Sequence, residues 1–231
     1  DVLGSRGLGD VYKRQGFAAL AGAASRAAGL HLNRQDLSRL ARRGSGSATR
    51  SIFGGFVAWQ QGHDDATSYA YPIDEQPTWD IAVVALVLTA KQKKISSRVG
   101  MKRAVETSPF YPAWITASQT DFKTMKTAIE TQDFELLGHT AEQNAMRMHA
   151  LTLSSDPTFT YFNADSIKAM NMVRDLRLRG ISCYFTMDAG PYVKIICHGS
   201  DAKRIAQHFQ TAFGQDHVLV TRPGAGISIS D

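Results

Sequence analysis

Side chains that bind anionic ligands are concentrated at positions 44–50, in the run GSGSATR. Its two glycines allow the backbone to approach a ligand closely. The hydroxyls of Ser45 and Ser47 can donate to phosphate oxygens, and Arg50 can bind a carboxylate or phosphate through two parallel hydrogen bonds. The alternative interpretation is a Gly/Ser loop that only turns the chain between a helix and a strand.

A second polar cluster follows the apolar stretch Ile81–Thr89 and contains Ser96, Ser97 and Arg98. The stretch has the length of a strand and an uninterrupted apolar character, which predicts a central strand buried on both faces. The cluster would then lie at the rim of a sheet, a common position for a ligand. The alternative is a solvated helix start that is capped by a serine.

A third candidate is Asp188, in the run FTMDAGP at positions 185–191. An acidic residue at the end of a buried strand, followed by Ala-Gly-Pro, is placed on a tight and rigid turn. From the residues alone, the common role of such an aspartate is to cap the turn.

The three regions share a resemblance to one family. The runs RRGSGSATRSIFGGF (42–56), SSRVGM (96–101) and FTMDAGP are similar to the mevalonate diphosphate decarboxylases, the first nearly residue for residue. This resemblance implies the fold of the small-molecule kinases related to galactokinase, homoserine kinase and mevalonate kinase. In that fold, a ribosomal protein S5-like N-terminal domain is joined to an α/β sandwich C-terminal domain.

The resemblance also implies a reaction: ATP-dependent decarboxylation of mevalonate 5-diphosphate to isopentenyl diphosphate, with ATP and Mg²⁺ as cofactors. Asp188 would orient or deprotonate the 3-hydroxyl, and a nearby Arg50 would hold the substrate carboxylate and keep Asp188 ionised. The residues expected to bind the substrate are Ser45, Ser47, Arg50, Ser97 and Arg98. A cytoplasmic homodimer is expected, with neither nucleic acid nor membrane as a partner.

The sequence departs from the family at Tyr192, where Asn usually follows Ala-Gly-Pro. Tyrosine is larger and lacks the paired donor and acceptor of an amide, so it either disturbs the loop that carries Asp188 or points outward.

Two other function classes remain as alternatives. One is a sister enzyme, a mevalonate 3-kinase or phosphomevalonate decarboxylase, and the other is a non-catalytic binding module, which Tyr192 favours.

Composition excludes little. The chain has 231 residues, 43% of them hydrophobic, and a formal charge of +5. Its basic residues are scattered and no nucleic-acid-binding motif occurs, so an enzyme that binds anionic phosphates accounts for the charge equally well.

Cys183 and Cys197 are expected to be buried free thiols, and His149 a hydrogen-bonded core histidine. The histidines show no metal-ligand spacing, and no apolar run reaches the ~20 residues of a membrane span.

The order of expected elements predicts an α+β fold. Residues 1–15 resemble translated adapter sequence and are expected to be non-native, 16–75 to be the remainder of an N-terminal domain, and 76–231 a C-terminal domain. A helix is expected from Phe17 to Gly29. The run VYKRQ precedes it, where the family has a phosphate loop, so the nucleotide-binding residues cannot be assigned. On this basis we expect an N-terminally truncated fragment that binds ATP poorly and shows no turnover.

Overall fold

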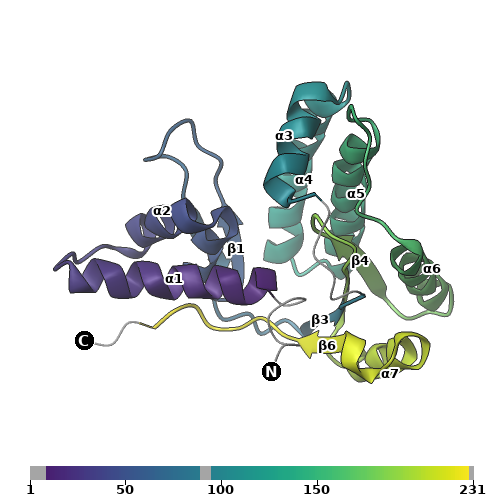
Figure 1. The fold of residues 1–231 in the computed structure, drawn as a ribbon. Coiled ribbons are helices and arrows are strands. Elements are labelled where there is room, and N and C mark those ends of the chain that lie inside the picture. Colours follow the sequence, from purple (N-terminus) through teal and green to yellow (C-terminus); the bar gives the residue numbers. More distant parts are fainter. Residues whose placement is uncertain (1–8, 89–94, 229–231) are drawn as a thin grey trace. The chain divides into compact units, whose positions relative to one another are not determined.

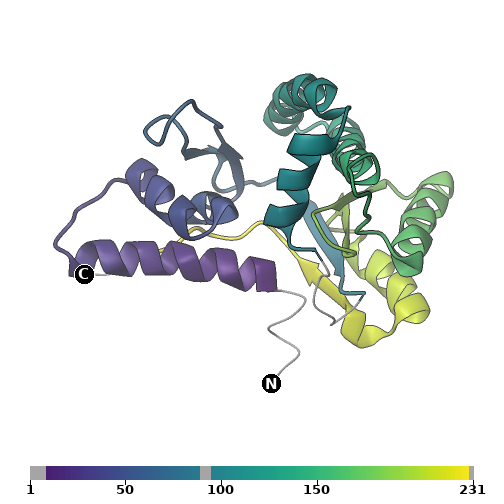
Figure 2. The ribbon, with the colours of Figure 1, turned by 45° about the horizontal axis from the view of Figure 1, so that its top comes forward.

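The computed structural model describes residues 9–88 and 95–228, with side chains from residue 14 onward. The chain divides into two compact units (Figures 1 and 2). The first comprises Asp1–Trp79 and Pro223–Asp231, and the second Asp80–Arg222. The C-terminal segment is thus part of the first unit, whereas the sequence interpretation placed it with everything after residue 75.

The first unit packs helices against a small hairpin. Its elements are α1 (Gly9–Ala27), α2 (Arg34–Gly44), a 3₁₀-helix η1 (Gly46–Ile52), β1 (Phe56–Trp59) and β2 (Ala70–Asp74). The two strands pair antiparallel. Small and apolar side chains of both helices and η1 form the core, namely Ala18, Ala21, Leu37, Ala41, Ala48, Ile52, Phe53 and Ala70.

Two expectations for this unit are wrong. Helix α1 begins at Gly9 and not near Phe17, so it includes residues that showed no recognisable periodicity. The apolar and small residues of Ser51–Trp59 predict a strand, but the strand exists only from Phe56, because η1 occupies the first part of this stretch. Gly55, with φ +63°, separates the two, since this left-handed conformation interrupts an extended strand.

The second unit is built on an antiparallel sheet with strand order β4-β5-β3-β6. The strands are β3 (Ile81–Leu86), β4 (Cys183–Met187), β5 (Val193–His198) and β6 (Val218–Thr221). The helical elements are α3 (Ser97–Thr107), α4 (Tyr111–Glu130), α5 (Phe134–Leu153), α6 (Ala164–Leu178), α7 (Ala202–Phe213) and the 3₁₀-helix η2 (Gln215–His217). The expected α+β character is confirmed. The strand-like runs Ile181–Met187 and Val193–His198 predict a hairpin around the intervening loop, and the β4–β5 pairing confirms it.

The central strand β3 differs from its expectation. Ala82, Val84 and Leu86 join the main core with side chains of α6 and α7, but Val83 and Ala85 are only half-buried. The strand is therefore central but not fully buried on both faces, because an antiparallel sheet can pack one face much more completely than the other. Residues 89–94, which include the expected end of this strand, lie outside the described residues.

The helical spacing of Phe122, Met125 and Ile129 predicts an apolar inner stripe on α4, but this helix buries a polar residue instead of the first of them. Phe122 is 40% exposed, whereas the adjacent Asp121 is buried. The Asp121 carboxylate accepts hydrogen bonds from Asn144 and Arg147 of α5, at 3.0 Å and 2.5 Å. This polar contact turns α4 so that Asp121 faces α5. On α6, helical spacing places Ile167 on the same predicted inner face as Met170 and Val173, yet Ile167 is exposed.

The two cysteines are buried and free, as expected. They are paired across the β4–β5 hairpin, where Cys183 is the register partner of Cys197. Burial raises the pKa of Cys183 to about 11 and that of Cys197 to about 12. Both thiols are therefore protonated and unreactive at neutral pH.

Candidate functional site

The three candidate residues of the first unit share one short stretch. The backbone N–H of Ser45 donates to the carbonyl of Ala41 at 3.1 Å and ends α2. Ser47 and Arg50 lie in η1, and the hydroxyl oxygens of Ser45 and Ser47 are 3.4 Å apart. The predicted Gly/Ser loop is in fact a helical turn, which fixes these side chains more tightly than a loop would.

The basic pair Arg42–Arg43, which precedes this turn, contacts Asp65. Arg39 adds a third cation at 2.9 Å from the same carboxylate. Hydrogen bonds from Arg39 and then Arg43 lower the pKa of Asp65 below its usual range. These arginines therefore tie α2 to the loop between β1 and β2, a role that the sequence did not reveal.

In the second unit, Ser96 caps the N-terminus of α3, and its hydroxyl accepts a hydrogen bond from the N–H of Val99 at 3.3 Å. The serine-capped helix start, considered above as the alternative, is therefore the correct local structure. Ser97 and Arg98 follow in the first turn of α3, and both are exposed. An exposed helix start with an arginine is a suitable place for an anionic group, so the two interpretations are compatible.

Asp188 directly follows β4, and its side chain is 70% exposed. It forms an ion pair with Lys194 of β5, the register partner of Thr186. Ser166, at the start of α6, donates a hydrogen bond to the carbonyl of Pro191 at 2.8 Å. Ser166 also forms a capping box with Asn163. The turn 188–192 is thus fixed by tertiary contacts, and its carboxylate remains accessible.

Two aromatic side chains surround the buried ring of His149, and one of them also contacts the start of α3. The hydroxyl of Tyr161 donates to the carbonyl of Ser96 at 3.3 Å. The ring of Tyr161 lies 6.1 Å from that of His149, and Phe162 lies 4.5 Å from the same ring. Asp188 in turn influences the protonation of His149. Tyr161 thus connects the start of α3 with the buried ring of His149 on α5.

The close packing of this link requires Gly100. A Cβ atom at that position would lie 2.4 Å from the hydroxyl oxygen of Tyr161. This explains a glycine in the run SSRVGM in physical terms.

His149 does not fulfil the expectation of a hydrogen-bonded core histidine. It is 1% exposed, and neither ring nitrogen has a hydrogen-bond partner of normal geometry within the described part of the chain. Desolvation lowers its pKa to about 4, although the backbone and the charge of Asp188 act in the opposite direction. The sequence segment NAMRMHA gave no indication of this unusual environment.

Lys194 and His149 are thus the residues near Asp188 that sequence reasoning missed. The hairpin register could have suggested Lys194, because position 194 pairs with position 186, two residues before Asp188. Arg50 belongs to the first unit and Asp188 to the second. A contact between these two side chains therefore stays a prediction.

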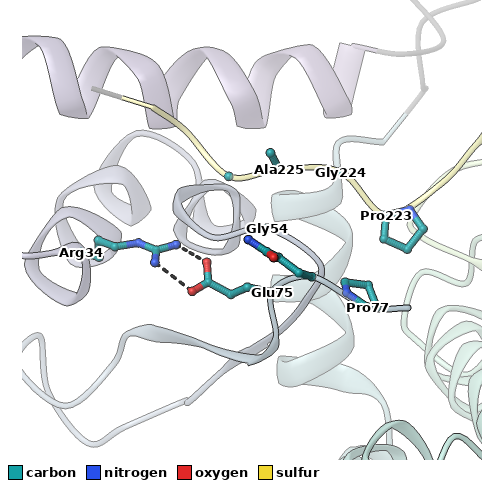
Figure 3. Close-up of a pocket in the computed structure, with 9 residues that line it drawn as sticks. Arg34, Gly54, Glu75, Pro77, Pro223, Gly224 and Ala225 are labelled. Carbon is teal, nitrogen blue, oxygen red and sulfur yellow. Dashed lines mark hydrogen bonds and ion pairs between the residues drawn. The ribbon is translucent and has the colours of Figure 1, made fainter. Parts of the chain in front are cut away.

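The first unit also contains a cavity of ≈ 500 Å³ between the start of α2, the end of β2 and the C-terminal segment (Figure 3). Arg34 and Glu75 face each other across it and form two hydrogen bonds, one of them at 2.9 Å. Glu75 already occupies the guanidinium, which argues against an anion site. The candidate residues Ser45, Ser47 and Arg50 do not line this cavity.

Glycines explain how the C-terminal segment fits beside the cavity. The N–H of Gly55 donates to the carbonyl of Gly224 at 2.9 Å. A Cβ atom on Gly54 would lie 2.8 Å from the backbone nitrogen of Gly226. The run FGGF is therefore a backbone docking site for residues 223–227, which is a structural role.

Within residues 9–88 and 95–228, no group of three or more His, Cys, Asp or Glu side chains could hold a metal ion. None of the helices in this part is long and apolar enough to cross a membrane.

Comparisons with known proteins match both units. Residues 83–224 match the model of the mevalonate 5-diphosphate decarboxylase C-terminal domain, and residues 14–70 match that of the diphosphomevalonate decarboxylase-like N-terminal domain. A diphosphomevalonate decarboxylase of Ganoderma lucidum is 35% identical over 210 residues, covering 87% of this chain and 52% of that protein. The chain thus spans about half the length of this curated relative.

Solved structures are similar over nearly the whole chain. The mevalonate diphosphate decarboxylase of Enterococcus faecalis, described for its mevalonate diphosphate mediated ATP binding mechanism, is 44% identical with a TM-score of 0.86. It covers 93% of this chain, which covers 65% of it. A structure of MDDEF in complex with MVAPP, AMPPCP and magnesium is 44% identical, with a TM-score of 0.87 and coverages of 93% and 66%.

The α+β architecture and these structural matches define the class of protein as the small-molecule kinase fold of galactokinase, homoserine kinase and mevalonate kinase. Within that class, the family models together match most of the chain. The chain belongs to the mevalonate 5-diphosphate decarboxylase family.

Proposed function

We propose that this chain takes part in the ATP-dependent decarboxylation of mevalonate 5-diphosphate to isopentenyl diphosphate, ADP, phosphate and CO₂. The observation that carries the proposal is the Asp188 turn. Its carboxylate is accessible and pairs with Lys194, and Ser166 holds the turn at the carbonyl of Pro191. A positioned, accessible carboxylate suits the activation of a substrate hydroxyl.

Asp188 would accept the proton of the 3-hydroxyl as that oxygen takes up a phosphoryl group. Loss of this phosphate together with CO₂ then creates the double bond of the product. Lys194, which pairs with Asp188 in the structure, would move aside or share the carboxylate when the hydroxyl binds. Phosphoryl transfer depends mainly on positioning and on charge stabilisation, which such groups supply.

Arg50 would hold the substrate carboxylate through two hydrogen bonds, and Ser45 and Ser47 would bind beside it. Ser97 and Arg98, exposed in the first turn of α3, would bind the charged end of the substrate. Arg50 and Asp188 lie in different units. Their joint action on one substrate molecule is therefore part of the proposal.

ATP and Mg²⁺ are proposed as nucleotide and metal ion, by analogy with the related complex that holds AMPPCP and magnesium. The described side chains supply no cluster that could hold the ion by itself. We therefore assign residues of this chain only to the binding and orientation of mevalonate diphosphate, and derive no step through the nucleotide or the ion.

Isothermal titration calorimetry with mevalonate 5-diphosphate tests this function. We expect the chain to bind it, and Arg50→Gln to weaken binding by about tenfold or more, since a charge-assisted bidentate contact is lost. Arg204→Gln on α7 is the matched control, because it removes an exposed guanidinium from a helix outside the candidate regions. Absence of binding by the unaltered chain would contradict the proposal. Stronger binding of mevalonate 5-phosphate would favour the phosphomevalonate-using sister enzyme.

Assembly into a homodimer in the cytoplasm is proposed from the family resemblance. Sedimentation equilibrium would test the assembly: a homodimer has twice the 25.3 kDa of one chain, and a mass of 25.3 kDa would contradict it.

A further inference from the structure

The C-terminal segment, residues 223–227, lies against the end of the helical turn that carries Arg50. Both belong to the first unit. A Cβ atom on Gly226 would lie 2.6 Å from the carbonyl oxygen of Ile52, the last residue of η1. From the other side, a Cβ atom on Gly54 would lie 2.8 Å from the backbone nitrogen of Gly226 (Figure 3). The two backbones are therefore in direct contact at the point where η1 ends.

Two further contacts hold the segment in this place. The N–H of Gly55 donates to the carbonyl of Gly224 at 2.9 Å. The half-buried side chain of Ile227 packs against the core of the first unit, which includes Ala48 and Ile52 of η1. The segment and η1 thus share one apolar core, and each limits the movement of the other.

The support reaches Arg50 through the backbone. The N–H of Phe53, which is buried, donates to the carbonyl of Arg50 at 3.2 Å. Local hydrogen bonds specify the helical conformation of η1, but 3₁₀ runs longer than 3–4 residues are uncommon because their hydrogen-bond geometry is poor. A run of seven residues therefore also depends on packing. The C-terminal segment supplies such packing at the end of η1 that carries Arg50.

We propose that the C-terminal segment positions Arg50: it holds the end of η1 against the core and so keeps the guanidinium in place for the carboxylate of mevalonate 5-diphosphate. The statement about the substrate rests on the proposed function, whereas the support of η1 by the segment does not. Gly226 acts on Arg50 through Ile52 and is a positioning residue. A glycine is required there because a Cβ atom would force the two backbones apart.

Hydrogen exchange with mass spectrometry tests the support without any ligand. Gly226→Ala should increase amide exchange at residues 46–53 by about tenfold or more, because the added Cβ displaces the segment from Ile52. Gly224→Ala is the matched control in the same segment, since nothing lies within 4 Å of its added Cβ, and it should leave this exchange unchanged. Unchanged exchange at residues 46–53 in Gly226→Ala would overturn the proposal.

A second variant removes the support without introducing a clash. Ile227→Ala deletes a half-buried side chain from the core and should increase exchange at residues 46–53, by a smaller factor than Gly226→Ala. Ile227→Leu conserves the volume and should restore most of the protection. If Ile227→Ala leaves exchange at these residues unchanged, the segment does not support η1.

Isothermal titration calorimetry with mevalonate 5-diphosphate tests the positioning of Arg50. We expect Gly226→Ala to weaken binding about threefold to tenfold, and Gly224→Ala to leave it unchanged. When Arg50→Gln is already present, Gly226→Ala should cause no further loss, because two residues that act through one contact are not additive. An equal loss in both backgrounds would mean that the segment only stabilises the unit, and would overturn the positioning role. If the unaltered chain does not bind the substrate, the proposed function fails, and the exchange experiment still decides whether the segment supports η1.

Discussion

The turn over residues 44–52 and the turn over residues 188–192 were both predicted to bind the substrate from their resemblance to one family. The structure holds the two turns in place by different kinds of contact. In the first, local helical hydrogen bonds fix Ser45, Ser47 and Arg50, and the neighbouring arginines are engaged with Asp65. In the second, the hydroxyl of Ser166 on α6 holds the backbone at Pro191, and Lys194 of the same hairpin pairs with the Asp188 carboxylate. The helical conformation of the first turn is specified by its own residues, whereas the turn over residues 188–192 depends on contacts with other parts of the second unit.

The largest expected effect on stability concerns the first unit, at Gly55, which follows the turn over residues 44–52 and immediately precedes β1. Gly55→Ala places a Cβ atom 2.1 Å from the carbonyl oxygen of Asp74, at a left-handed φ of +63°. We expect a loss of about 2–4 kcal/mol in the unfolding free energy, with amide exchange increased in the first unit. Hydrogen exchange with mass spectrometry measures this. Gly16→Ala is the control, since nothing lies within 4 Å of its added Cβ and it sits in helix α1. Equal stability of the two variants would contradict this explanation of Gly55.

The next effect is a difference between the two units in how their stability depends on pH. His149 has its pKa lowered from 6.5 to about 4, so its contribution to stability is present above pH 6.5 and is lost as the pH falls toward 4. The loss is on the order of 3 kcal/mol at most. Asp65 in the first unit has a pKa below 3.8, so its contribution is lost only at lower pH. Denaturant unfolding should show that the unfolding free energy decreases from pH 7 to pH 4. His149→Phe should remove this decrease. If the same decrease persists in the variant, other titrating groups cause it, and this account of His149 is wrong.

A smaller effect is expected when a tertiary support of the Asp188 turn is removed. Ser166→Ala deletes a buried hydroxyl that donates to Pro191 and belongs to a capping box, at a cost of about 1–3 kcal/mol. Amide exchange should increase at residues 188–192. Ser38→Ala is the matched control in the first unit, because its buried hydroxyl accepts from the N–H of Ala70 at 3.1 Å. The control should lose stability without loosening the Asp188 turn; loosening in both would contradict a specific role for Ser166.

The smallest effect concerns the ion pair at the Asp188 turn. Lys194→Met removes the partner of an exposed carboxylate, and exposed pairs contribute only about 0–1 kcal/mol. We expect thermal unfolding to change little. A loss comparable to that in Ser166→Ala would show that the ion pair, and not the buried hydroxyl, holds the turn.

The parts of the fold that could be predicted from the sequence were set by local pattern. The β4–β5 hairpin, the cap at Asn33, whose side chain accepts from Asp36 at 2.8 Å, and the stop at Gly180 follow from neighbouring residues. The exposed Phe122 could not be predicted, because Asp121 is turned inward by Asn144 and Arg147 of another helix. The early start of α1 was missed because its first turns lack an apolar stripe.

The residues of the candidate site also fall into two groups, those that a local sequence pattern identifies and those that only tertiary contacts reveal. Asp188 and the start of α3 were found from motifs that lie in continuous sequence. Lys194 and His149 are connected to Asp188 only by strand pairing and by the packing of α5, which no local pattern records. Arg42 and Arg43 belong to the run that resembles the family, but their ion pairs with Asp65 could not be predicted from that run.

The central claim is that both turns serve one substrate. Adding mevalonate 5-diphosphate to the ¹⁵N-labelled chain and mapping the amide shifts tests it most directly. The account predicts saturable shifts at residues 45–50, at 97–98 and at 188–192. Shifts confined to the residues that line the Arg34–Glu75 cavity, with both turns unchanged, would contradict it.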